Sequence, residues 1–95
     1  RSGAAEINSV SFLKSGINYY ASIKDYDRAA TLSERLAEIS EPDSEIWNNQ
    51  ARLYYLLNKK DQAEAAFQKA LALNPTLVED WNEFKAFIDA NRKEE

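Results

Sequence analysis

The acidic loop EPDSE, residues 41–45, gathers three carboxylates within five residues. Oxygen ligands of this kind are those that a calcium ion prefers, but the loop lacks the central glycine and the alternating ligand positions of an EF-hand. Ser44 as the cap of a following helix, with acidic neighbours favoured by the helix dipole, explains the same residues. We therefore expect a helix start at this loop and no metal site.

Catalytic side chains are scarce, because the sequence contains neither histidine nor cysteine. The acidic pairs Asp25/Asp27 and Glu94/Glu95 fall in an expected turn and at the end of the chain, where water surrounds the carboxylates. No glycine-rich phosphate loop, nucleophile elbow or HExxH motif occurs. The sequence therefore predicts a protein that is not an enzyme and needs no cofactor.

The composition predicts a single helical domain over residues 1–95. Hydrophobic residues at 44% and charged residues at 29% are typical of globular proteins, whereas only 2 glycines and 2 prolines leave room for long helices. The net charge of −4 is spread over segments of mixed sign, and the lysines at 24, 59 and 60 are too few for a nucleic-acid patch. We expect no nucleic-acid partner.

No apolar run approaches the roughly 20 residues of a membrane span, and no signal-peptide pattern opens the sequence. We expect no membrane insertion, and a cytoplasmic location is favoured. The chain begins with Arg1 and contains no methionine. We therefore interpret it as a piece of a longer protein, with residues 1–9 as a linker or as a remnant of cloning.

The sequence matches itself when it is shifted by 34 residues. The shift aligns Leu13 with Trp47 and Trp81, Tyr20 with Tyr54 and Ile88, and Ala29 with Ala63. Apolar residues three and four apart predict five helices, at about 7–22, 26–40, 45–57, 61–73 and 77–92. The aromatic residues at 47, 54, 67 and 81 are expected to pack in the core between the helices.

Helix starts and ends are marked by capping residues and prolines. Asp61 with Glu64 and Thr76 with Glu79 have the spacing of a capping box. The prolines at 42 and 75 end helices between hairpins, because proline disfavours helix at the residue before it.

Trp, Tyr, Ala, Phe, Ala and Pro occur at residues 47, 54, 63, 67, 70 and 75. This spacing resembles the tetratricopeptide repeat, with Gln50 and Ala51 in place of the usual Leu-Gly pair. Residues 44–77 form the well-matched repeat and residues 10–43 a divergent one, in which Leu13, Tyr20, Tyr26 and Ala29 match. Residues 78–95 resemble the capping helix that closes such arrays.

The resemblance implies an all-α, right-handed solenoid of antiparallel helical hairpins whose first helices line a concave groove. It also implies a non-catalytic scaffold or adaptor that binds a peptide or helix of a partner protein. The register places the following residues on the groove: Lys14, Asn18, Glu45, Asn48, Asn49, Arg52, Tyr55, Glu79, Asn82 and Glu83.

Lys14, Asn18 and Asn49 are similar to the lysine and two asparagines with which some tetratricopeptide domains hold the C-terminal carboxylate of a chaperone. The two cationic positions that follow in that clamp fall on Glu79 and Glu83, which would repel an acidic tail. The groove would then grade from positive to negative and orient a partner of complementary charge.

Two hypotheses remain open for the function. One is a groove that binds a peptide or helix of a partner protein, including a co-chaperone-like grip on an acidic C-terminal tail. The other is a structural segment that stacks on further repeats or on a second copy, with Leu13, Tyr20 and Tyr26 as contact residues.

Overall fold

The computed structural model describes residues 10–93, which fold into five helices and no strands. The helices are α2 (Val10–Ser22), α3 (Tyr26–Ile39), α4 (Ser44–Leu56), α5 (Lys60–Leu73) and α6 (Leu77–Lys93). The predicted all-α fold is confirmed. The predicted linker 1–9, the predicted start of the first helix at residue 7 and the acidic pair at 94–95 lie outside the described residues.

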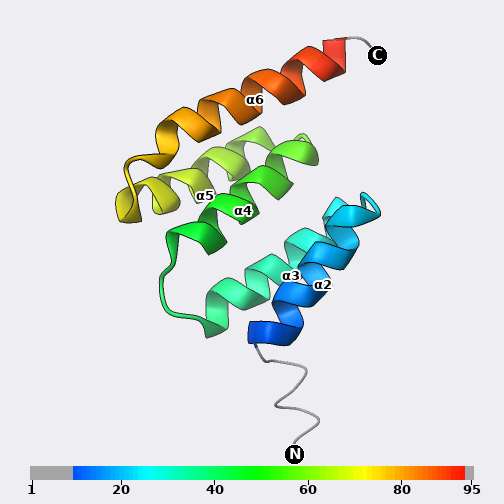
Figure 1. Ribbon diagram of the computed structural model, residues 1–95, viewed down its shortest axis with the longest axis vertical. Helices are drawn as coiled ribbons and strands as arrows, with labels where there is room; N and C mark the ends of the chain where they lie inside the picture. The colour runs from blue at the N-terminus through cyan, green and yellow to red at the C-terminus, as the bar shows by residue number, and fades with distance from the viewer. Residues whose placement is uncertain (1–9, 94–95) are drawn as a thin grey trace, which may run out of the picture.

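The helices form two hairpins and a final single helix. α2 packs on α3 and α4 packs on α5, while α3 contacts α4 and α6 contacts both α4 and α5. Figure 1 shows these layers stacked along the long axis, with α2 and α3 at one end and α6 at the other. The result is a short helical solenoid.

Both hairpins turn in the same way. Lys24 and Asn58, which are 34 residues apart, both have a φ of 65°. This left-handed conformation is uncommon for residues other than glycine, and it reverses the chain within a few residues. The backbone N–H groups that follow, those of Asp25 and Lys59, donate to the carbonyls of Tyr20 and Tyr54 at 2.8 and 2.9 Å. The 34-residue repeat therefore extends to the geometry of the turns.

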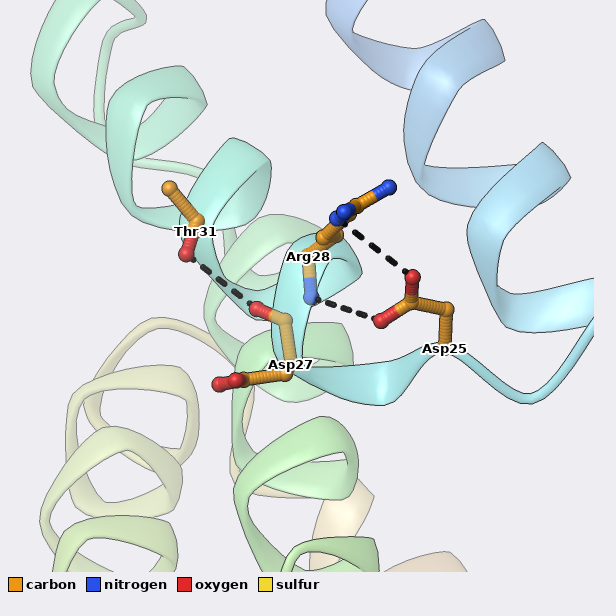
Figure 2. Close-up of polar contacts among 4 residues, drawn as sticks. All are labelled: Asp25, Asp27, Arg28 and Thr31. Atoms are coloured by element: carbon orange, nitrogen blue, oxygen red, sulfur yellow. Dashed lines mark hydrogen bonds and ion pairs between the residues drawn. The ribbon is translucent and has the colours of Figure 1, made fainter.

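The residue after each of these turns is the N-cap of the next helix. Asp25 caps α3: its carboxylate accepts from the Arg28 backbone N–H at 3.3 Å and lies 3.6 Å from the Arg28 Nε (Figure 2). Lys59 occupies the equivalent position before α5 and makes no side-chain cap bond. The predicted capping box at Asp61 is therefore wrong, because the turn at Asn58 starts the helix one residue earlier and leaves Asp61 inside its first turn.

Of the other two predicted caps, the one before α4 shifts by one residue, and Thr76 directly precedes α6. Asp43, not Ser44, caps α4, since its carboxylate accepts from the Glu45 backbone N–H at 2.9 Å and Ser44 is already helical. Before α6, the Thr76 hydroxyl donates to Asn74 Oδ1 at 2.7 Å. Asn74 therefore organises this loop.

Small residues allow the helices of each hairpin to approach closely. Ala29, Ala51, Ala63 and Ala70 have no exposed surface. Gly16 serves the same purpose between α2 and α3, because a Cβ at this position would lie only 2.7 Å from Leu32 Cδ1. Close helix packing thus begins one residue earlier in the first repeat, at Gly16, than at Ala51 in the second.

Of the aromatic residues predicted in the core, Tyr54, Phe67 and Trp81 are at most 7% exposed, which confirms the prediction for these three. Trp47 is half-buried and packs against the core with the Lys69 ammonium 4.4 Å from its ring centre. Leu13 is 1% exposed inside the first hairpin. The prediction that Leu13 contacts a second copy is therefore wrong.

Candidate functional site

A groove separates the first helices of the two hairpins. No Cα atom of α2 lies within 8 Å of one of α4 among the described residues, whereas α3 packs directly on α4. The groove contains a hollow of about 130 Å³ lined by Lys14, Ile17, Asn18, Ser33, Leu36, Glu45, Ile46 and Asn49. Four of these residues, Lys14, Asn18, Glu45 and Asn49, belong to the predicted groove.

A second hollow of about 170 Å³ continues the first. It is lined by Ile17, Asn18, Ala21, Asn49, Arg52 and Leu53. Because Ile17, Asn18 and Asn49 line both hollows, the two form one continuous surface, which we call the α2–α4 groove. This groove brings together five predicted residues, with Arg52 at one end and Lys14 and Glu45 at the other.

Arg52 is held in place by an aromatic ring. Its guanidinium carbon lies 5.1 Å from the centre of the Phe84 ring on α6, an arrangement in which a cation is attracted to the ring face. Arg52 Nε and the nearby Asn48 Oδ1 are buried and lack hydrogen-bond partners within the described part of the chain. Buried polar atoms are normally paired, so these two are exceptions, and Asn48 lines neither hollow.

The remaining predicted groove residues lie elsewhere. Tyr55 is only 4% exposed: its hydroxyl donates to Asp89 Oδ1 at 2.7 Å and its ring meets Trp81 edge-on. The prediction of Tyr55 as a groove-lining residue is therefore wrong, because α6 covers it. Glu79, Asn82 and Glu83 are exposed on α6 and line neither hollow of the α2–α4 groove.

A buried polar network supports the groove from below. The Ser33 hydroxyl, which lines the first hollow, donates to Gln50 Oε1 at 3.4 Å, and Gln50 Nε2 donates to the Tyr54 hydroxyl at 3.3 Å. Tyr54 in turn donates to Glu34. The network joins α3 to α4, so it fixes one wall of the groove against the other hairpin.

Burial raises the pKa of both tyrosines of α4. Burial, followed by the hydrogen bond to Glu34, raises the pKa of Tyr54 to about 12. Burial and the hydrogen bond to Asp89 likewise raise the pKa of Tyr55. Both hydroxyls therefore stay protonated near neutral pH and act as donors.

The sequence register does not predict the apolar residues that form the floor of the groove. Ile17, Leu36 and Ile46 line the first hollow, and Ile46 packs with Leu13 and Leu36 in a small core cluster. The sequence contains a signal for one of these residues, because Ile17 lies three residues after Lys14 and one before Asn18. Amphipathic helices place such a residue at the edge of the polar face.

The described residues contain no group of three or more acidic side chains placed to hold a metal ion. Glu41, Asp43 and Glu45 are all exposed, and Asp43 is used as a helix cap. None of the described helices is long and apolar enough to cross a membrane.

Two sequence profiles described as tetratricopeptide repeat match the chain, at residues 10–44 and 44–77. The chain belongs to the tetratricopeptide repeat family and contains two repeats. The first repeat is the α2–α3 hairpin and the second the α4–α5 hairpin, while α6 packs against the second repeat. Neither curated proteins nor solved structures gave a match.

Tetratricopeptide repeats generally mediate protein–protein interactions, and the family is typically a non-catalytic interaction module.

Proposed function

We propose that this domain is a protein-interaction module whose α2–α4 groove binds an extended segment of a partner protein. The observation that carries the proposal is the meeting of Lys14, Asn18 and Asn49 around one hollow. A lysine ammonium and two amides can each donate to a carboxylate, and charge-assisted hydrogen bonds of this kind are strong.

The chemistry of the groove favours an acidic segment. Lys14 and Arg52 supply positive charge at the two ends, and Asn18 and Asn49 supply neutral donors between them. Glu45 is the one acidic side chain among the residues that line the two hollows, and it is exposed. The apolar floor can take up an aliphatic side chain of the same segment, which adds burial to the polar contacts.

The acidic residues of α6 also favour one orientation of a bound segment. Glu79 and Glu83 are exposed on α6, which lies on the other side of α4 from α2 (Figure 1). They would repel the acidic part of a partner and attract a basic part, so a segment of mixed charge would bind in one orientation.

An NMR titration of the isotope-labelled domain tests the proposal. The ligands are an acidic peptide with a free C-terminal carboxylate and the same peptide with an amidated C-terminus. We expect the free acid to shift the resonances of Lys14, Asn18 and Asn49. Equal shifts from both peptides would support the groove without a grip on the terminal carboxylate, and shifts confined to other surfaces would contradict the proposal.

Two charge reversals separate the groove from general charge effects. Arg52→Glu should weaken binding of the acidic peptide by about tenfold, the size expected when an attractive pair becomes a repulsive one. Lys59→Glu changes the net charge equally but lies on the exposed α4–α5 turn, so it should leave the affinity nearly unchanged. Equal effects of the two variants would show that binding follows net charge alone.

A further inference from the structure

The outer face of α2 carries large apolar side chains in contact with water. Tyr19 is 60% exposed, and Phe12, seven residues before it, is 53% exposed. Ile23, in the turn directly after α2, is 54% exposed, and its backbone N–H still donates to the Tyr19 carbonyl at 3.3 Å. Residues at spacings of four and seven lie on one face of a helix. α2 and α3 form the end of the solenoid opposite α6 (Figure 1). By helical spacing, this face lies on the other side of α2 from Lys14 and Asn18, which line the α2–α4 groove.

The repeat shows what this kind of face does when it is covered. The residues 34 positions after Phe12 and Tyr19 are Ile46 and Leu53, which are 6% and 5% exposed. Ile46 packs with Leu36 of the preceding hairpin. The same register position is thus buried against another pair of helices in the second repeat and open to water in the first.

The open face contains both a projection and a depression. Tyr20, Arg28, Thr31 and Leu32 surround a mostly apolar hollow of about 220 Å³ between α2 and α3. The Tyr19 ring lies beside this hollow, since its centre is 5.3 Å from that of Tyr20 in an edge-on arrangement. A surface that carries a projecting tyrosine next to a hollow can be complementary to itself, as a two-fold symmetric interface requires.

Few charged side chains lie at this face. Lys14 is the one charged residue of α2, and it lies in the groove on the other side of the helix. Arg28, at the edge of the hollow, is bound to the Asp25 carboxylate and lies over the Tyr20 ring, with its guanidinium carbon 5.8 Å from the ring centre (Figure 2). Arg28 therefore enters the pairing as part of an ion pair, while Arg35, four residues after Thr31 on α3, is an exposed cation near this face.

We propose that the open face of α2 and α3 binds the same face of a second copy of this chain, forming a two-fold symmetric dimer. In this dimer Tyr19 of each copy enters the hollow between Tyr20 and Leu32 of the other. Aromatic residues that fill a pocket at the centre of an interface contribute most of its binding energy. The α2–α4 grooves stay open, so the dimer would present two of them to partner proteins.

Sedimentation velocity over a wide concentration range tests the proposal. We expect the wild-type chain to shift from monomer to dimer as its concentration rises. Tyr19→Glu should raise the dissociation constant about 30-fold or more, because it places a charge in the apolar hollow. Tyr19→Phe should retain the dimer. Since Tyr19 is mostly exposed, circular dichroism should show both variants folded, and Ile23→Lys provides an independent second variant.

A matched control lies at the other end of the molecule. Phe87 on α6 is 65% exposed, and Phe87→Glu should leave the dimer intact. A wild-type chain that stays monomeric, or a Tyr19→Glu variant that still dimerises, would overturn the proposal. So would a head-to-tail pairing, in which each Glu variant alone is monomeric and an equal mixture of the two recovers a dimer.

Discussion

The two junctions of this solenoid are built from the same repeat but are filled differently. At the first junction, α3 packs on α4 through Leu36, Ile46 and a polar network, and no Cα atom of α2 lies within 8 Å of one of α4 among the described residues. At the second, α6 fills the space with rings: Trp81 stacks on Phe67 with ring centres 4.7 Å apart and planes within 12°, and it also stacks on Phe84. Stacked rings close the second junction, whereas a groove remains between α2 and α4 at the first.

Equivalent positions in the repeats do not leave the same amount of surface exposed. Leu13, Trp47 and Trp81 occupy equivalent positions, yet Trp47 is half-buried beneath Lys69 and Trp81 is the largest fully buried side chain. Trp81 has this environment because α6, the last helix of the described residues, packs on both α4 and α5. Its packing face therefore rests entirely on the second hairpin.

Removal of Trp81 should have the largest effect on stability. Trp81→Ala should lower the free energy of unfolding by about 3–5 kcal/mol, the usual cost of truncating a buried aromatic residue. Urea denaturation followed by circular dichroism measures this loss. The matched control is Phe87→Ala, which removes a ring that is 65% exposed and should change the free energy by less than about 0.5 kcal/mol. A similar loss in both variants would mean that the second junction is not closed by Trp81.

The polar network of the first junction should contribute less. Tyr54→Phe removes the hydroxyl that donates to Glu34 and accepts from Gln50, and it should cost about 1–2 kcal/mol. Phenylalanine keeps the ring, so the loss in urea denaturation reports the hydrogen bonds. A neutral effect would show that these hydrogen bonds do not stabilise the first junction.

Tyr54 also predicts a pH dependence. Its pKa is raised from 10.0 to about 12 in the folded protein, so above pH 10 the unfolded state loses the proton before the folded state does. Its contribution is complete below pH 10 and is lost as the pH rises towards 12. Urea midpoints measured over this range should fall more steeply for the wild type than for Tyr54→Phe. The variant keeps a smaller decline because the pKa of Tyr55 is also raised.

The smallest effect is expected at the end of α4. Arg92 of α6 donates to the backbone carbonyls of Tyr55 and Leu56 at 2.8 and 3.0 Å. A cation at a helix C-terminus is favoured by the helix dipole, so Arg92→Ala should cost about 1 kcal/mol in urea denaturation. Asn91→Ala changes an exposed neighbour and should have almost no effect. Equal losses in the free energy of unfolding for the two variants would show that Arg92 does not stabilise the second junction.

The helices and the family could be predicted from the sequence because both depend on local patterns. Apolar periodicity and the 34-residue spacing repeat within each hairpin, and the aromatic positions follow from them. The capping prediction at Asp61 failed for a reason that these patterns do not contain: Asn58 adopts a left-handed conformation without being glycine. The equivalent residue, Lys24, gives no clearer signal in the sequence.

The predicted groove residues also divide into those placed by local sequence patterns and those placed by packing between helices. Lys14, Asn18 and Asn49 lie where the register predicts, because α2 and α4 are equivalent helices of successive repeats. Tyr55 does not, since its environment depends on how α6 docks, which involves Trp81 and Asp89 across the junction. That the α2–α4 groove binds a partner stays a prediction.

The pattern of helix contacts has a consequence for how the chain folds. Among the described helices, none contacts another more than two places along the chain. Proteins dominated by contacts between residues near in sequence fold in microseconds to milliseconds, because little chain entropy is lost before each contact forms. In an array of this kind each layer depends only on its neighbours, so opening can begin at α6 while the first hairpin stays intact.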